Sequence, residues 1–278
     1  MNFIENYKKS IIQKLLSHSE ILTVYCAGSN MPLFECGEET FADRVYVFDS
    51  DEMMKKYVTS IADKKLPLKG VKFLQKDKMA FFTMLLTCNI DEILFMDSAG
   101  RHVIQLSDIV KKNDMSKLPK EKRPVENPQL KLCGAYFAQE ACRNVPNEEK
   151  RLQEMEEELS ANIVRATFVV PIIPEQMPQS EASPDSQEQA ADGQPQQVKI
   201  RFPLIKTPKE DMFQPIFTDN FEFARYNKNG ACKGMAVPFR NLHTVFAKES
   251  KGFMINPSGF HLVITPQMLQ GLTKRFLS

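Results

Sequence analysis

The sequence predicts an α+β fold built from two tandem copies of one small mixed α/β domain, each with a twisted sheet flanked by helices. Apolar patterns of period 2 and period 3.6 alternate along the chain, capping and turn residues separate them, and the same order of motifs occurs twice. At 278 residues, of which 42 % are hydrophobic, the chain is long enough for two domains of ordinary size.

The first repeated motif is a strand that runs into a capped helix. Val47-Phe-Asp-Ser-Asp-Glu-Met-Met-Lys-Lys-Tyr57 corresponds to Ile216-Phe-Thr-Asp-Asn-Phe-Glu-Phe-Ala-Arg-Tyr226. In both segments an apolar pair precedes Asp, Ser or Thr, whose oxygens accept hydrogen bonds from the free N–H groups at the start of a helix. Apolar residues then follow at helical spacing up to a tyrosine.

The second repeated motif is a strand that leads into an apolar helix. Lys69-Gly-Val71 corresponds to Lys233-Gly-Met235. The helix of the first copy is expected from Lys78 to Cys88, and that of the second is expected to begin at Pro238, because proline suits the first helical position.

The third repeated motif is a β-hairpin. Phe95-Met-Asp-Ser-Ala-Gly-Arg-His-Val-Ile104 corresponds to Phe253-Met-Ile-Asn-Pro-Ser-Gly-Phe-His-Leu-Val-Ile264, with turn residues at the centre of each. Ser107 and Thr265 are then expected to open a further helix. Upstream, a helical stripe precedes a strand in both copies, at 4–27 and at 152–173.

These matches predict three regions. Residues 1–112 form a divergent copy, residues 113–146 form a basic, proline-broken linker region, and residues 147–278 form the second copy. Within that linker region, 129–144 carries apolar residues that are expected to pack. The stretch 175–197, with five acids and no Lys or Arg, is expected to be a disordered acidic insert in the second copy.

Composition excludes several classes of partner. The formal net charge is +1, which provides no field for nucleic acid, and no apolar run approaches the roughly 20 residues of a membrane-spanning helix. The N-terminus lacks the features of a signal peptide. Six cysteines without a Cys-x-x-Cys pair are expected to be buried free thiols, so we predict a cytoplasmic protein.

No motif for a chemical reaction is present. The sequence lacks a phosphate-binding Gly-rich loop, a Gly-x-Ser-x-Gly elbow and a His-Glu-x-x-His motif. We therefore expect no enzyme, no cofactor and no metal. The candidate binding residues are Arg240 and His243 on the segment after Pro238, and His102 and His261, which occupy the same place in the two hairpins. A binding role is not required for these residues. Arg240 and His243 could simply form the solvent-exposed face of a helix, and His102 and His261 could be copies of one position in a duplicated hairpin.

Three motifs in order resemble the N-terminal domain of the SseB family, the bacterial enhanced-serine-sensitivity proteins. They are Pro215-Ile-Phe-Thr-Asp219, Val237-Pro-Phe-Arg-Asn-Leu242 and Gly252-Phe-Met-Ile-Asn-Pro-Ser-Gly259. The resemblance covers about 163–278, and the first copy resembles the family only through its match to the second. It implies a small α+β domain with no assigned activity and no catalytic residues.

The leading functional hypothesis is a non-enzymatic binding or adaptor protein of a bacterial cytoplasm, whose partner is another protein. Two related surfaces in tandem would raise its effective affinity. The alternatives are a small-molecule sensor, or an enzyme with a site between the two copies that uses His102, His243 or His261 as acid or base.

Overall fold

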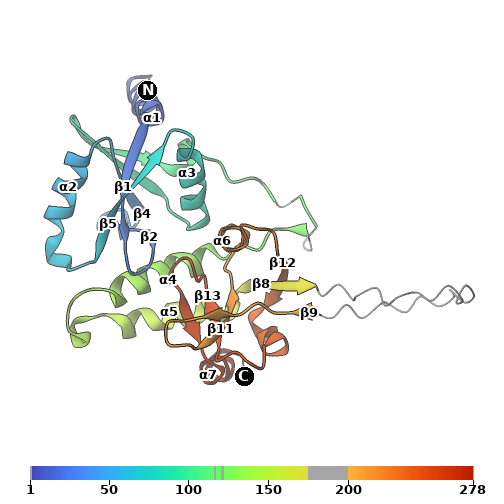
Figure 1. Cartoon of the computed structure of the whole chain (residues 1–278). Helices are drawn as coiled ribbons and strands as arrows, with labels where there is room; N and C mark the ends of the chain where they lie inside the picture. Colours follow the sequence, from blue (N-terminus) through green and yellow to red (C-terminus); the bar gives the residue numbers. More distant parts are fainter. Residues whose placement is uncertain (1, 116, 120–121, 175–199, 278) are drawn as a thin grey trace, which may run out of the picture.

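The computed structural model describes residues 2–115, 117–119, 122–174 and 200–277. The predicted acidic insert at 175–197 lies outside the described residues. Figure 1 shows an α+β body from the N-terminal half above one from the C-terminal half, with helix α4 (Pro128–Ala141) at the junction and α5 (Leu152–Arg165) beside it in the C-terminal half.

The N-terminal half is built on a seven-stranded mixed sheet. The strand order is β2-β1-β4-β6-β7, with β3 paired to β4 and β5 paired to β1. Only β4 and β6 are parallel among these pairs. The strands are β1 (Glu20–Cys26), β2 (Met31–Pro32), β3 (Phe34–Cys36), β4 (Asp43–Phe48), β5 (Leu68–Leu74), β6 (Glu92–Asp97) and β7 (Gly100–Gln105).

Alternating side chains give this sheet two buried faces. Val45 and Val47 of β4 pack in one cluster with α1 (Asn2–Ser17) and α3 (Lys78–Thr87). Phe48 packs in another cluster with Tyr57 of α2 (Asp51–Ser60). The first half is therefore a three-layer α+β unit, as the period-2 pattern predicts.

The C-terminal half has one core between α5, two small sheets and the last helix. The sheets have the orders β10-β11-β13-β14 and β12-β8-β9, and a bridge between Val169 and Phe217 joins them. The elements are β8 (Thr167–Pro174), β9 (Ile200–Arg201), β10 (Ile205–Lys206), β11 (Met212–Ile216), α6 (Asn220–Tyr226), β12 (Lys233–Pro238), the 3₁₀ helix η5 (Phe239–Val245), β13 (Phe253–Ile255), β14 (Leu262–Ile264) and α7 (Pro266–Phe276).

The strand pairings of the two halves correspond one to one. Antiparallel β1–β5 corresponds to β8–β12, parallel β4–β6 to β11–β13, and antiparallel β6–β7 to β13–β14. The α+β fold class is confirmed. The prediction that the two halves are copies of one ancestral domain stays a prediction, and the matching strand pairings are consistent with it. The registers that agree are Leu22↔Phe48 with Val169↔Phe217, and Val24↔Gly70 with Pro171↔Gly234.

The two hairpins align two residues away from the predicted match. Ile93 pairs with Ile104 in the first hairpin and Phe253 pairs with Ile264 in the second, so Phe253 corresponds to Ile93 and not to Phe95. The reason is the turn, which leaves two residues between the paired ends of β6 and β7 and six between those of β13 and β14. The predicted equivalence of His102 and His261 is therefore wrong.

Two predicted helices are shorter than expected. Pro238 ends β12, and the 3₁₀ helix η5 follows it, so Pro238 precedes the helix and does not occupy its first position. After the first hairpin, Ser107 belongs to the three-residue 3₁₀ helix η2 (Leu106–Asp108). Thr265 does cap α7 with its side chain, and Pro266 is the first residue of that helix, as predicted.

Part of the expected linker is a buried helix. α4 begins at Pro128, inside the region 113–146, and contributes to both cores. Leu132 and Ala135 belong to the core of the first half, whereas Leu130 and Cys133 belong to the core of the second. One face of α4 thus seals each half, so this stretch joins the two halves by packing, and the boundaries of the domains stay a prediction.

Candidate functional site

A groove of about 600 Å³ runs between η5 and α7 in the C-terminal half. The buried rings of Phe239 and Phe253 form its floor, and Leu269 of α7 lines one wall. Phe246 meets Phe253 edge to face, with 5.2 Å between ring centroids. The groove is therefore apolar inside.

Local sequence explains why η5 and α7 face each other. Pro238 ends the ladder of β12 and turns the chain into η5, while Thr265 stops β14 and caps α7 through its side chain. Because β12 and β14 end beside one core, η5 and α7, which follow them, lie on the two sides of the groove.

The rim of the groove is basic. Arg240 and His243 extend from η5 and Lys274 extends from α7, and all three side chains are exposed. No Asp or Glu is among the residues that line the groove. The combination of an apolar floor and a cationic rim suits a ligand that carries an anionic group next to apolar ones.

Two of the predicted site residues, Arg240 and His243, thus lie together in one groove. Sequence reasoning missed the residues that face them, which are Leu269 and Lys274 of α7 and Leu277 just after it. The signal was present as an amphipathic pattern over 266–276 that ends on basic residues, but the pattern does not say what the apolar face lies against.

His102 lies in another part of the chain and is buried. Its Nε2 is 3.0 Å from Oδ1 of Asp97, and its Nδ1 is 2.9 Å from the hydroxyl of Tyr7. Because the carboxylate only accepts, Nε2–H donates to Asp97 and Nδ1 accepts the hydroxyl of Tyr7. Lys14 donates to the other oxygen of Asp97 at 2.6 Å. These contacts fasten α1 to the first hairpin.

Asp97 is held in its charged form by those donors. Burial raises the pKa of its carboxyl, but the hydrogen bonds from Lys14, His102 and the N–H of Ala99 outweigh burial and lower the pKa to about 2. The group therefore has the character of a structural anion rather than of an acid or base that works near neutral pH.

His261 lies away from the other three predicted residues. It is exposed just before β14, its backbone φ is +38°, and its Nδ1 is 3.1 Å from the carbonyl oxygen of Gly259 in its own turn. The structure therefore brings together Arg240 and His243 only.

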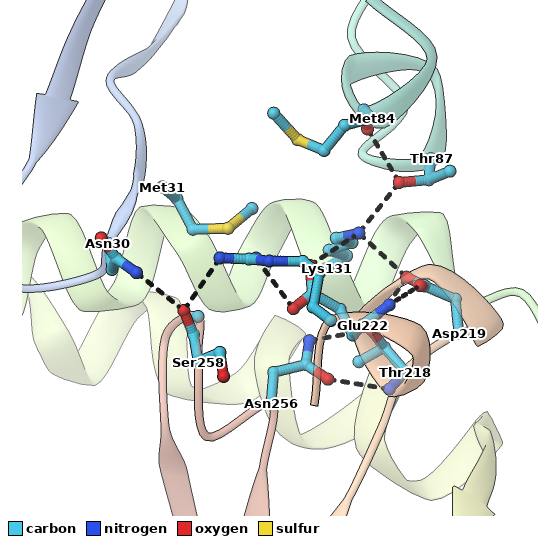
Figure 2. A network of polar contacts seen from close by, with 12 residues as sticks. Asn30, Met31, Met84, Thr87, Lys131, Thr218, Asp219, Glu222, Asn256 and Ser258 are labelled. Carbon is cyan, nitrogen blue, oxygen red and sulfur yellow. Dashed lines mark hydrogen bonds and ion pairs between the residues drawn. The ribbon is translucent and has the colours of Figure 1, made fainter. Parts of the chain in front are cut away.

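A second polar cluster lies between the halves and is buried. Figure 2 shows Lys131 of α4 between Thr87 of α3 on one side and, on the other, Glu222 of α6 and Asp219, which caps that helix. Its Nζ is 3.0 Å from Asp219, 3.1 Å from Glu222 and 2.9 Å from Thr87. Burial lowers the pKa of Lys131, but Cys88, Asp219 and Glu222 raise it above its ordinary value.

The rest of this cluster ties turns of the two halves together. Asn30, after β1, donates to the carbonyl oxygen of Ser258 at 2.9 Å, and Arg225 donates to the same oxygen and to Glu222. Every charge of the cluster has a partner, and the lysine is fully buried. The cluster fixes the two halves to each other; a lone Lys in the apolar run Leu130-Lys-Leu-Cys133 was its signal in the sequence.

A larger groove, of about 810 Å³, lies beside the first sheet and α4. Its lining has five basic and five acidic side chains, and several of them pair with each other, among them Lys64 with Glu35 and Arg143 with Glu140. The charges balance, so this groove has no net preference for a cation or an anion.

The described residues form neither a metal-binding cluster nor a membrane-spanning helix. They contain no group of three or more His, Cys, Asp or Glu side chains able to hold a metal ion. None of their helices combines the length and the apolar character needed to cross a bilayer.

Comparison with known families decides the identity of the C-terminal half. Residues 147–271 match the SseB protein N-terminal domain. The C-terminal half of this chain is an SseB domain. The match includes β8 through β14, all of η5 and the first part of α7, so the groove lies largely within the SseB domain, with its rim residue Lys274 just beyond the match.

The search of curated proteins found no match to this chain. Among solved structures, Tic22 of Anabaena, described as a protein transport protein, aligns over 96 % of each chain at 10 % identity, with a TM-score of 0.20. A likeness at that score supports no inference about fold or function. The resemblance of the second copy to SseB is thus confirmed, and that of residues 1–112 stays a prediction.

Proposed function

We propose that this chain is a non-enzymatic binding protein whose SseB domain holds a segment of a partner protein in the groove between η5 and α7. The segment carries acidic side chains next to apolar ones. The observation that supports this proposal is the groove itself, where Phe239 and Phe253 form an apolar floor below a rim of Arg240, His243 and Lys274.

The charge of the rim selects the sign of the partner. Arg240 carries a positive charge on the rim, and no carboxylate is among the described residues that line the groove, so an acidic segment would be attracted there and a basic segment would be repelled. Affinity comes from the apolar side chains above the buried floor, Phe246, Leu269 and Leu277, which are partly exposed in the free protein and become covered on binding.

A catalytic role has less support. His243 has no carboxylate beside it in the groove, and His102 and Asp97 are engaged with Tyr7 and Lys14. The proposal also assigns one binding groove and not two related surfaces, because the first half has the three-residue η2 where the SseB domain has α7.

A cytoplasmic location stays a prediction that rests on the free cysteines.

A phage-displayed library of short random peptides tests the proposal against the whole chain. We expect the enriched peptides to combine Asp or Glu with Leu, Phe or Met, and to bind the wild-type protein much better than the Arg240→Glu variant. The matched control is Lys228→Glu, an exposed lysine of the same domain that does not line the groove. Enrichment of basic peptides, or equal binding to Arg240→Glu, would contradict the proposal.

The small-molecule alternative rests on the volume, since about 600 Å³ is also within the range of ligand pockets. Decanoate serves as its probe, because it joins a carboxylate to an apolar chain. If decanoate raises the melting temperature of the wild type but not of Leu269→Lys, and no peptide is enriched, the sensor is the correct function.

A further inference from the structure

Two cysteines from distant parts of the sequence meet where α4 ends against the first sheet. Sγ of Cys26, in the last position of β1, is 2.9 Å from Sγ of Cys142, which caps the C-terminus of α4. Both are free thiols. Cys26 is fully buried, whereas Cys142 is partly exposed.

We propose that Cys26 and Cys142 are a redox modification site, at which a small-molecule disulfide or another two-electron oxidant of thiols converts them reversibly into an intramolecular disulfide. A disulfide bond needs about 2.05 Å between the two sulfur atoms, so the atoms have less than 1 Å to close. The remaining four cysteines lie apart from this pair, because no contact between sulfur atoms other than Cys26–Cys142 is present among the cysteines of the described residues.

The close approach depends on Gly28. A Cβ atom at position 28 would lie 2.4 Å from Cβ of Cys142 and 2.8 Å from its Sγ. Any larger residue would therefore push Cys142 away from the end of β1. The turn after β1 is thus shaped to admit the Cys142 side chain.

The difference in exposure sets the order of the reaction. The thiolate of Cys142 attacks one sulfur of the small disulfide and expels one small thiolate, which takes up the proton lost from Cys142. Sγ of Cys26 then attacks the Cys142 sulfur of the mixed disulfide, expels the second small thiolate and gives up its own proton to it. Two protein thiols and one small disulfide become one protein disulfide and two small thiols.

The pair is slow to react at neutral pH. Burial, together with the hydrogen bond to Cys26, raises the pKa of the Cys142 thiol to about 12. Only the thiolate attacks, so its fraction and the rate increase about tenfold per pH unit over the whole range below that pKa. An ordinary exposed thiol, with a pKa near 9, would level off at lower pH.

The disulfide would tie α4 to the first half. α4 also contacts the SseB domain through Leu130, Cys133 and Lys131, so a bond at its C-terminus restrains the junction between the halves. Because the bond closes a loop between residues 116 positions apart, the unfolded chain loses much freedom, and we expect a rise in the melting temperature of several degrees.

The experiment treats the full-length protein with oxidised glutathione at pH 7, 8, 9 and 10, traps remaining thiols with iodoacetamide in denaturant, and maps the peptides by mass spectrometry. The expected result is a monomer with a 26–142 cross-link, a rate that rises through the whole range, and a higher melting temperature that dithiothreitol reverses. Gly28→Ala should slow cross-linking severalfold.

Two variants control the measurement. Cys36→Ser removes an exposed thiol outside the pair and should leave the cross-link unchanged, whereas Cys142→Ser should abolish it while the reduced protein keeps its melting temperature. The proposal fails if Cys26 and Cys142 both remain open to alkylation while Cys36 is glutathionylated. It also fails if Cys142 retains glutathione and Cys26 does not displace it.

Discussion

Lys131 and Asp219 form an ion pair of 3.0 Å across the junction of the two halves, with side chains that are 0 % and 5 % exposed. Charges that are buried to this degree are tolerated only when each has a partner. The pair therefore makes the relative position of α4 and α6 a matter of electrostatics as well as of packing.

Replacement of Lys131 by methionine should destabilise the protein. Met has nearly the same length but no charge, so Asp219 and Glu222 would keep buried negative charges with one partner fewer, at a cost of about 3–5 kcal/mol in the free energy of unfolding. Urea denaturation measures this cost. Adding Asp219→Asn should recover part of it, because Asn also caps α6 and removes one of the stranded charges.

The control for that experiment is the exposed pair Lys206–Glu210, whose Nζ–Oε1 distance is 2.8 Å. Lys206→Met should change the free energy of unfolding by less than about 1 kcal/mol. Equal losses from Lys131→Met and Lys206→Met would show that the buried cluster does not hold the junction.

Replacing either of two helical glycines by alanine should change the free energy of unfolding, in opposite directions. Gly271 of α7 has open space around it, so Gly271→Ala should raise the free energy of unfolding by about 0.5–1 kcal/mol through helix propensity. A Cβ atom at Gly134 of α4 would lie 2.8 Å from the ring of Phe260, so Gly134→Ala should lower it by about 1 kcal/mol or more. If both variants are stabilised, α4 does not pack against the second hairpin as described.

We expect the protein to lose stability in acid, because protonation of Asp97 removes the contribution of its charged hydrogen bonds. Its pKa is about 2 in the folded protein and about 3.9 in the unfolded chain, so its contribution is complete above pH 4 to 5 and disappears as the pH falls toward 2. The difference corresponds to on the order of 2 kcal/mol. Denaturation between pH 6 and pH 2 should show this decline, and Asp97→Asn should have a lower free energy of unfolding at pH 6 and a flatter pH dependence.

Binding at the groove of the SseB domain should depend on salt. A peptide selected for the groove should lose about tenfold or more in affinity on Arg240→Glu at low ionic strength, and the difference should shrink as salt screens the exposed rim. Fluorescence anisotropy at several salt concentrations measures it. A loss that is independent of salt would mean that Arg240 acts through packing and not through its charge.

The sequence predicted much of the fold because its signals are local. Ser50 and Asp219 do accept hydrogen bonds from the third residue after them and so cap α2 and α6. Tyr57 and Tyr226, which end the two repeated segments, pack against Phe48 and Phe217 with ring centroids 5.4 and 5.2 Å apart. Such matches depend on neighbours in the chain, which the sequence displays directly.

The sequence-based predictions failed where the length of a turn or a contact between distant residues determines the structure. The sequence match that starts at Phe253 made His261 equivalent to His102. That match cannot show how many residues of each hairpin lie in the turn and how many pair in the strands. The candidate site was half visible: Arg240 and His243 were predicted, but the wall supplied by α7 was not.

By itself the sequence determined the α+β class, the caps of α2, α6 and α7, the order of the longer strands, and the SseB character of the second half. The fold class, caps and turns follow from the period of apolar residues and from turn chemistry, both of which act over a few residues, whereas the SseB character came from the resemblance of three motifs to that family. Only the tertiary structure decided that Lys131 meets Asp219, that Cys26 meets Cys142, and that η5 and α7 enclose a groove. These contacts join residues far apart in the chain, and which of them form depends on how complete cores pack against each other.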